Sequence, residues 1–160
     1  MQKITPFLWF DTEGEDAARF YTSVFPNSRI VDIQRYGEAG PRDAGTVMTV
    51  AFELEGQRFV ALNGGPDFTF NEAISFAVEC EDQDEVDRYW DTLTDGGEPG
   101  PCGWLKDKFG VSWQIVPKRL TELLADEDRE KAQRVMGAML RMGKIEIAAL
   151  EEAAEAQEVS

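Results

Sequence analysis

The sequence contains no histidine and only two cysteines, Cys80 and Cys102. Histidine is the commonest general base and the commonest metal ligand, so its absence excludes Ser-His-Asp and Cys-His catalysis together with histidine-based metal sites. Two cysteines are too few for a disulfide framework or a zinc cluster. We therefore interpret both as free thiols.

Basic residues are also scarce, because 16 lysines and arginines face 31 aspartates and glutamates, for a net charge of −15. Nucleic-acid binding needs a clustered basic surface, so no nucleic-acid partner is expected. No apolar run approaches the ~18–20 residues of a membrane span, and residues 1–6 lack a signal-peptide pattern. These absences predict a cytoplasmic protein with no membrane partner.

The stretch 102–117 organises the rest of the chain. Two apolar runs, 103–105 and 111–116, flank the short polar link 106–110, a pattern typical of a β-hairpin. Pro117 cannot donate a hydrogen bond to a ladder, so the second strand should end there. From residue 118 onward the apolar residues repeat at helical spacing.

The residues before this hairpin form two similar blocks. The first predicts a strand at 4–10, a helix carrying Ala17, Phe20, Tyr21 and Val24, and strands at 28–36, 46–54 and 58–62. After the linker 63–67, the second predicts a strand at 73–80, a helix carrying Val86, Tyr89, Trp90 and Leu93, and then the hairpin.

The two blocks align without gaps at their starts, with Phe7 on Phe76, Asp16 on Glu85 and 19–21 on 88–90. We interpret this repetition as a duplicated β-α-β-β-β unit, with chance similarity of amphipathic helices as the alternative. The predicted fold class is α+β. One domain, 1–117, contains modules 3–63 and 73–117, and a helical extension follows at 118–160.

Several segments resemble one known family. They are 8–11, 18–27, 59–66, 71–76, 80–83, 102–107, 110–114 and 142–150. With the duplication, they resemble the PhnB-like family, often labelled 3-demethylubiquinone-9 3-methyltransferase, of the vicinal oxygen chelate superfamily, which includes glyoxalase and bleomycin-resistance proteins. The resemblance implies two modules that form a cupped mixed sheet.

The superfamily's usual metal ligands, carried over by this resemblance, fall on Pro6, Ala61, Ser75 and Gln114, with Ala61 uncertain by one residue. Such side chains are poor ligands for a divalent ion, so we expect neither a metal nor another cofactor. The methyltransferase label also lacks support, because neither Gly64-Gly65 nor Gly96-Gly97 forms a glycine-rich strand-to-helix turn.

Strand alternation places Phe7, Trp9, Phe76 and Val78 toward the helices. It leaves Leu8, Phe10, Asn63, Ser75, Ala77, Glu79, Ser112 and Gln114 facing the cup. The predicted ligand-binding residues are Leu8, Phe10, Asn63, Ser75, Glu79, Trp104 and Gln114, and the candidate catalytic residues are Glu79 and Cys102. The alternatives are that the amides satisfy nearby backbone, that Glu79 is solvated, and that Trp104 is packing.

The sequence thus predicts a metal-free protein that binds a small, partly aromatic molecule in the cup. The alternatives are an enzyme that uses Glu79 as acid or base, or Cys102 as nucleophile, and an interaction module that docks through its helical tail. The stripe Val135, Met136, Met139 and Leu140 needs a covering surface, which predicts a homodimer.

Overall fold

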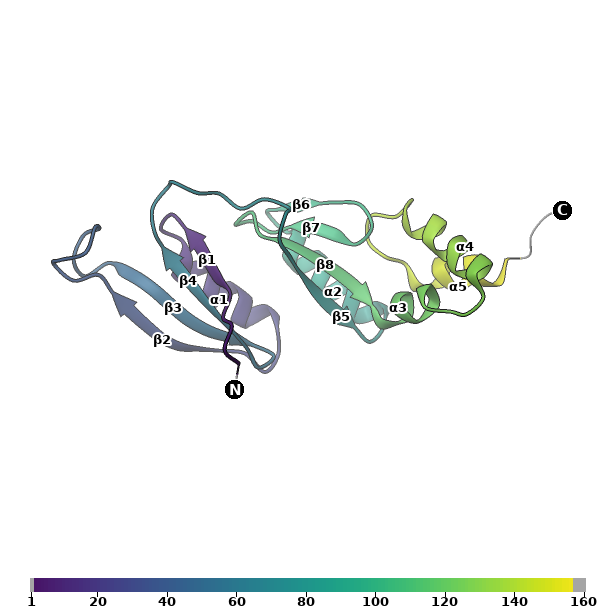
Figure 1. Ribbon diagram of the computed structural model, residues 1–160, viewed down its shortest axis with the longest axis horizontal. Helices are drawn as coiled ribbons and strands as arrows, with labels where there is room; N and C mark the ends of the chain where they lie inside the picture. Colours follow the sequence, from purple (N-terminus) through teal and green to yellow (C-terminus); the bar gives the residue numbers. More distant parts are fainter. Residues whose placement is uncertain (1, 157–160) are drawn as a thin grey trace. The chain divides into compact units, whose positions relative to one another are not determined.

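A computed structural model of the chain describes residues 2–156 and divides into two compact units between Phe70 and Asn71 (Figure 1). The first unit contains β1 (Phe7–Phe10), α1 (Gly14–Val24), β2 (Arg29–Arg35), β3 (Val47–Leu54) and β4 (Gln57–Asn63). Its sheet has the order β1-β4-β3-β2, in which β1 is parallel to β4 and the other pairs are antiparallel.

The second unit repeats this topology. It contains β5 (Ser75–Cys80), α2 (Gln83–Thr94), β6 (Glu98–Pro99), β7 (Trp104–Lys106) and β8 (Ser112–Pro117). The sheet order is β5-β8-β7-β6, again with one parallel pair, β5 and β8. The predicted α+β class and the duplicated module are confirmed. The two-residue edge strand β6 was not predicted, because it is short and contains a proline.

The core of the first unit is aromatic. The ring of Tyr21, on α1, stacks on Phe52 of β3 at 6.1 Å between centroids, and Phe52 stacks on Phe59 of β4 at 5.5 Å. All three side chains are buried. Burying large aromatic side chains provides much of the hydrophobic stabilisation of a small unit, and here it fixes α1 on one face of the sheet.

The predicted hairpin is confirmed as β7 and β8, and a buried carboxylate holds its link. One oxygen of Asp107 accepts hydrogen bonds from the backbone N–H groups of Phe109 (2.8 Å) and Val111 (3.1 Å). Its other oxygen accepts from the indole N–H of Trp113 at 2.8 Å. Asp107 is only 3 % exposed, so these charge-assisted bonds compensate for its loss of hydration.

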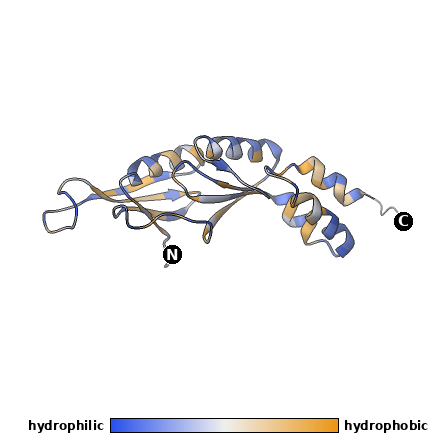
Figure 2. Ribbon diagram, turned by 90° about the horizontal axis from the view of Figure 1, so that it is seen from above, coloured by the Kyte–Doolittle hydropathy of each residue, from blue (hydrophilic) through white to orange (hydrophobic). Residues whose placement is uncertain are grey.

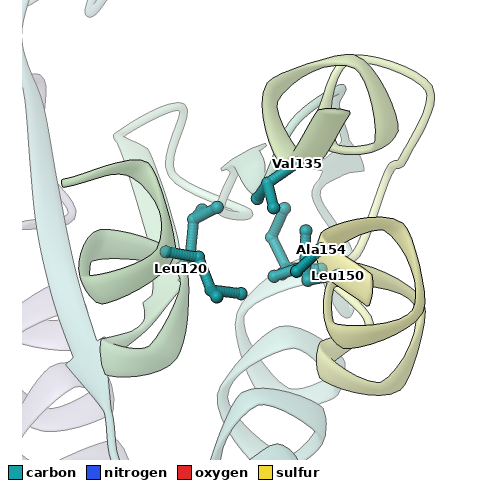
Figure 3. Close-up of a cluster of buried hydrophobic side chains, with 6 residues drawn as sticks. Leu120, Val135, Leu150 and Ala154 are labelled. Atoms are coloured by element: carbon teal, nitrogen blue, oxygen red, sulfur yellow. The ribbon is translucent and has the colours of Figure 1, made fainter. Parts of the chain in front are cut away.

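The C-terminal residues form α3 (Lys118–Leu124), α4 (Arg129–Met139) and α5 (Ile147–Glu155), as predicted. Their buried side chains form one cluster in which α4 and α5 pack on α3 (Figure 3). The cluster consists of Leu120, Leu123, Val135, Ile145, Leu150 and Ala154. In Figure 2 hydrophobic and hydrophilic residues alternate along these helices, as expected for helices buried on one side.

The apolar stripe on α4 does not have the role that the sequence suggested. Val135 is fully buried inside the cluster, and Met139 packs against the same cluster. Only Leu140 is largely exposed, at 61 %. Most of the stripe is therefore covered by α3 and α5 of the same chain, and it does not by itself call for a partner.

Candidate functional site

In the first unit, Leu8 and Phe10 face α1, contrary to the prediction. Leu8 lies opposite Ala61 and Phe10 opposite Asn63 in the register of β1 and β4, so each pair shares a face of the sheet. That face is the helix side, because the side chains of Ala61 and Asn63 lie against Gly14 at the start of α1. Leu8 and Phe10 are accordingly 7 % and 3 % exposed. The strand is apolar on both faces, so its alternation could not indicate the correct one.

Asn63 was expected to face the cup, but it has a structural position at the start of α1. Its side-chain oxygen accepts from the backbone N–H of Gly14 at 2.7 Å, and its amide nitrogen donates to the carbonyl of Val47 at 3.2 Å. The hydroxyl of Tyr36 donates to its backbone carbonyl at 2.6 Å. Asn63 thus caps α1, whose own N-cap residue makes no side-chain hydrogen bond to the first turn of the helix.

The open face of the first sheet carries Phe7 and Trp9. The indole N–H of Trp9 donates to the carbonyl of Gly65 at 2.9 Å, and Phe68 contacts its ring edge-on at 4.9 Å. Phe7 and Phe68 are 61 % and 64 % exposed. This face is therefore apolar around β1, whereas further along β2 to β4 it carries Glu53, which pairs with Arg29 and Arg58.

The second sheet presents its polar side chains on its open face, as predicted. Ser75 lies opposite Ser112, and Gln114 lies opposite both Ala77 and Trp104. The opposite face carries Phe76, Trp113 and Ile115, and packs under the buried side of α2, which bears Val86, Tyr89, Trp90 and Leu93. Phe76 thus faces the helix, as Leu8 does in the first unit, whereas Phe7 faces the other way. The sequence alignment of the two modules, which placed Phe7 on Phe76, therefore shifts by one residue at β1.

Gln114 and Ser75 pair with each other on this open face. The amide nitrogen of Gln114 donates to the Ser75 hydroxyl at 2.9 Å, which links the neighbouring strands β8 and β5. Glu79 lies further along β5 and is exposed, so it is not held in an enclosed pocket. The carboxylate of Glu79 and the Gln114–Ser75 pair are not part of the cavity described next.

A cavity of about 410 Å³, called the Trp104 cavity below, lies between β6, the 100–102 loop and β7. Its apolar wall includes Pro99, Pro101 and Trp104, and Cys102 lies in the same wall. Trp104 is half-buried, so its ring is accessible while its backbone is held by β8. The structure therefore brings together Trp104 and Cys102, two of the predicted residues.

Ser112 lines the same cavity and has an unusual environment. It is 1 % exposed, and its hydroxyl is the one buried side-chain polar atom in residues 2–156 without a hydrogen-bond partner. A buried polar group without a partner costs roughly 1–3 kcal/mol, so native structures seldom keep one. A ligand in the cavity could supply the missing partner. Strand alternation predicts that Ser112 faces the open side of the sheet, like Gln114 two residues later. The sequence does not mark it as a binding residue.

The C-terminal extension supports the wall of this cavity. The backbone N–H groups of Cys102 and Gly103 donate to the carbonyls of Met142 and Gly143, each at 2.8 Å. Cys102 and Gly103 both have left-handed backbones, with φ of 58° and 85°. Such a conformation is unfavourable for a residue other than glycine, so the contact with 142–143 helps to hold Cys102 in place.

The two thiols differ in environment. Cys80 is fully buried beneath α2, and burial, with the charge of Glu85 as a smaller contribution, raises the pKa of its thiol to about 12. Cys102 is partly exposed. Because the thiolate is the nucleophilic form, Cys80 is inert, and Cys102 is the thiol that can meet a ligand.

The positions matching the superfamily's metal ligands do not offer a chelating set. Ala61 faces α1, the Ser75 hydroxyl and the Gln114 amide bond to each other, and Pro6 has no donor. Shifting the first module by one residue would substitute Phe7 and Leu62, which cannot coordinate either. Within residues 2–156, no three acidic, cysteine or histidine side chains cluster in a way that could hold a metal ion. We therefore derive no chemistry through a metal.

A larger hollow of about 770 Å³ lies in the first unit, beside the start of α1. Its arginines and its buried amide already have partners: Arg35 donates to the carbonyl of Gly45, Arg42 pairs with Asp11 at 3.9 Å, and Asn63 is bonded as described above. Its size exceeds that of the Trp104 cavity, but it contains no buried polar group that a ligand would satisfy.

Comparison with known proteins identifies the family. The family model described as 3-demethylubiquinone-9 3-methyltransferase matches residues 2–116. A Bacillus cereus PhnB protein, described with the same methyltransferase name, is 41 % identical, with a TM-score of 0.65 over 72 % of this chain and 99 % of its own. No curated protein sequence matches the chain.

More distant structures share the fold. A Pseudomonas aeruginosa protein is 18 % identical, with a TM-score of 0.60 over 73 % of this chain and 98 % of its own. The fosfomycin resistance protein FosX of Mesorhizobium loti is also 18 % identical, with a TM-score of 0.56 over 79 % of this chain and 100 % of its own. None of the helices in residues 2–156 is long and apolar enough to cross a membrane. The chain belongs to the PhnB-like family described as 3-demethylubiquinone-9 3-methyltransferase.

Proposed function

We propose that this protein binds a small, partly aromatic molecule in the Trp104 cavity on the second sheet, without a metal. The observation that carries the proposal is the buried Ser112 hydroxyl, which lines a cavity of about 410 Å³ beside an accessible indole and lacks a partner among the described residues. Apolar walls with a few oriented polar groups are the usual form of a small-molecule site.

The proposed site is narrower than the set of residues predicted from the sequence. Trp104 and Ser112 contact the ligand, with Cys102 in the adjoining wall. Ser75, Glu79 and Gln114 lie on the same face outside the cavity and would contact a ligand that extends along the sheet. Leu8, Phe10 and Asn63 lie on the α1 side of the first sheet and are not proposed as ligand contacts.

Binding is favoured over methyl transfer because, within residues 2–156, no glycine-rich turn leads from a strand into a helix. Gly64 follows β4 but packs against the indole of Trp9, and Gly96-Gly97 follow α2. A nucleotide-type methyl donor commonly sits where such a turn opens a helix. An enzymatic role through Cys102 is the second candidate, because its thiol lines the proposed site.

We further propose a cytoplasmic homodimer that does not bind nucleic acid. The net charge of −15 disfavours nucleic acid, and Cys80 and Cys102 are both free. The exposed aromatic residues around β1, Phe7 and Phe68, replace the stripe on α4 as the reason to expect a partner copy.

A metabolite library screened by thermal shift and native mass spectrometry tests the binding proposal. Trp104→Leu should weaken any ligand found by at least about tenfold, because stacking on an aromatic ring contributes ~1 kcal/mol or more. Trp9→Leu, the matched change on the open face of the other sheet, should leave affinity unchanged. If neither Trp104→Leu nor Trp9→Leu changes the affinity of the ligands found, the cavity is not the binding site.

A further inference from the structure

The rim of the Trp104 cavity is negatively charged. The carboxylate of Glu72 and the ammonium of Lys106 form an ion pair there, and Glu98 lies on the same rim. Glu98 lies opposite Lys106 in the register of β6 and β7, and its charge acts on that ammonium, although the two form no ion pair within 4.0 Å. One cation thus faces two carboxylates, which leaves one negative charge in excess on the rim.

Trp104 provides the surface on which a ring or a cation can rest. The electron-rich face of an indole attracts cations more strongly than that of tyrosine or phenylalanine. Lys106 follows two residues later on the same face of β7, but its ammonium is already bound to Glu72. Hence the cavity has a cation-attracting ring, and the nearest lysine is engaged elsewhere.

Ser112 adds a third constraint, which concerns hydrogen bonding. A serine hydroxyl can accept from an N–H group or donate to an oxygen, so it can pair with the polar atom of a heteroaromatic ring. A purely hydrocarbon ligand would leave this buried hydroxyl without a partner, and its binding free energy would lack the contribution of that hydrogen bond.

Resting on the function proposed above, we propose that the Trp104 cavity selects a cationic aromatic amine over an anion with the same ring. The ring contacts Trp104, a polar ring atom pairs with Ser112, and the ammonium lies beside Glu98. An anionic analogue is repelled by the excess negative charge of the rim and by the net charge of −15.

Three indole probes test the charge preference by isothermal titration calorimetry on the full chain. Tryptamine carries an ammonium, indole-3-acetate a carboxylate, and indole no charge. We expect tryptamine to bind at least about tenfold more tightly than indole-3-acetate, with indole in between, and the preference to shrink as salt is added.

Glu98→Gln should reduce the ratio of the two affinities about threefold, because it removes the excess negative charge of the rim. Glu81→Gln is the matched control, since it removes one exposed carboxylate outside the cavity. Equal effects of the two variants would assign the preference to overall charge and overturn the proposed role of Glu98.

The outcomes separate this inference from the binding proposal. Two outcomes overturn the ligand class and leave the binding function standing. In the first, indole-3-acetate binds as tightly as tryptamine or more tightly. In the second, tryptamine does not bind, while another library ligand binds and is weakened by Trp104→Leu. If no probe and no library ligand responds to Trp104→Leu, the binding function itself is wrong, and the inference falls with it.

Discussion

At the scale of single residues, the open face of the second sheet contains both paired and unpaired hydroxyls. Ser75 accepts from Gln114, and this hydrogen bond satisfies it within the protein. Ser112, opposite Ser75 in the register, is buried and has no such partner in the described chain. The same residue type on the same face therefore stabilises the fold in one position and costs free energy in the other.

Replacing Ser112 tests this contrast. Ser112→Ala should raise the free energy of unfolding of the ligand-free protein by about 1 kcal/mol, because it removes an unsatisfied buried hydroxyl. The same change should weaken a ligand that uses this hydroxyl. Urea denaturation with and without a ligand measures both effects.

Ser75→Ala is the control for that experiment. It removes the acceptor of the Gln114 amide, so it should not stabilise the protein, and it should leave the affinity of a ligand confined to the Trp104 cavity nearly unchanged. If Ser112→Ala instead destabilises the ligand-free protein, the hydroxyl has a partner in solution and the basis for the proposed site is lost.

Cys80 predicts a pH dependence of stability. Burial raises the pKa of its thiol from 9.0 to about 12, so above about pH 9 the native state retains a proton that the unfolded chain releases. Its contribution to stability is therefore complete below pH 9 and declines as the pH rises toward 12. We expect Cys80→Ala to lose stability less steeply than the wild type between about pH 9 and about pH 11 in urea denaturation. Lys106 and Lys144 titrate in both proteins, so parallel curves would contradict the role of Cys80.

At the scale of elements, the C-terminal extension is joined to the cavity wall by hydrogen bonds. The family match ends at residue 116, so α3, α4 and α5 lie beyond the region that defines the family. Even so, 142–143 pair with the backbone of Cys102 and Gly103. The extension therefore acts as part of the second unit and helps to shape a site built by the module.

Gln83, in the first turn of α2, anchors this extension. Its amide nitrogen donates to the carbonyl of Ile145 at 3.0 Å, and its side-chain oxygen accepts from the N–H of Ile147 at 2.7 Å. Lys144 pairs with Asp87 on the same helix at 2.8 Å, and this ion pair raises the pKa of Lys144 and lowers that of Asp87.

Gln83→Leu should lower the free energy of unfolding by about 1–3 kcal/mol, since it leaves two backbone groups without their partner. It should also increase the rate at which a thiol reagent modifies Cys102, because the segment holding the 102–103 turn is loosened. The control is Gln133→Leu on the exposed side of α4, which should change neither quantity. Unchanged labelling of Cys102 in Gln83→Leu would show that the extension does not support the wall.

At the scale of the whole molecule, the donor set predicts that zinc and nickel do not bind stoichiometrically. Ser75 and Gln114 are adjacent, but they provide a hydroxyl and an amide, which are weak ligands for these ions. Ser75→His combined with Gln114→His should create measurable zinc and nickel affinity, because it places two imidazoles on neighbouring strands. Isothermal titration calorimetry measures both proteins. Stoichiometric binding by the wild type that is lost in Gln114→Leu would contradict the metal-free proposal.

The proposed dimer is a second prediction at this scale. Light scattering should give a mass close to twice the 18.0 kDa of one chain at micromolar concentration. Phe7→Glu, among the exposed aromatic residues at the edge strand β1, should shift the mass toward one chain, since a charge there would have to be desolvated. Leu140→Glu is the control, because Leu140 is equally exposed but lies on the C-terminal extension. A monomeric wild type, or a mass that changes only with Leu140→Glu, would contradict this prediction.

The amino-acid sequence by itself determined the duplicated β-α-β-β-β order, the hairpin at 102–117 and the absence of histidine ligands, because these depend on local periodicity and composition. Only the tertiary structure decided which face of β1 is buried, since Phe7, Leu8, Trp9 and Phe10 are all apolar and either alternation would fit. It alone showed that Asn63 caps a helix 49 residues earlier and that Gln83 holds a segment 62 residues later. The isolation of the Ser112 hydroxyl likewise depends on every neighbour packed around it, and contacts between distant segments leave no periodic signal in the sequence.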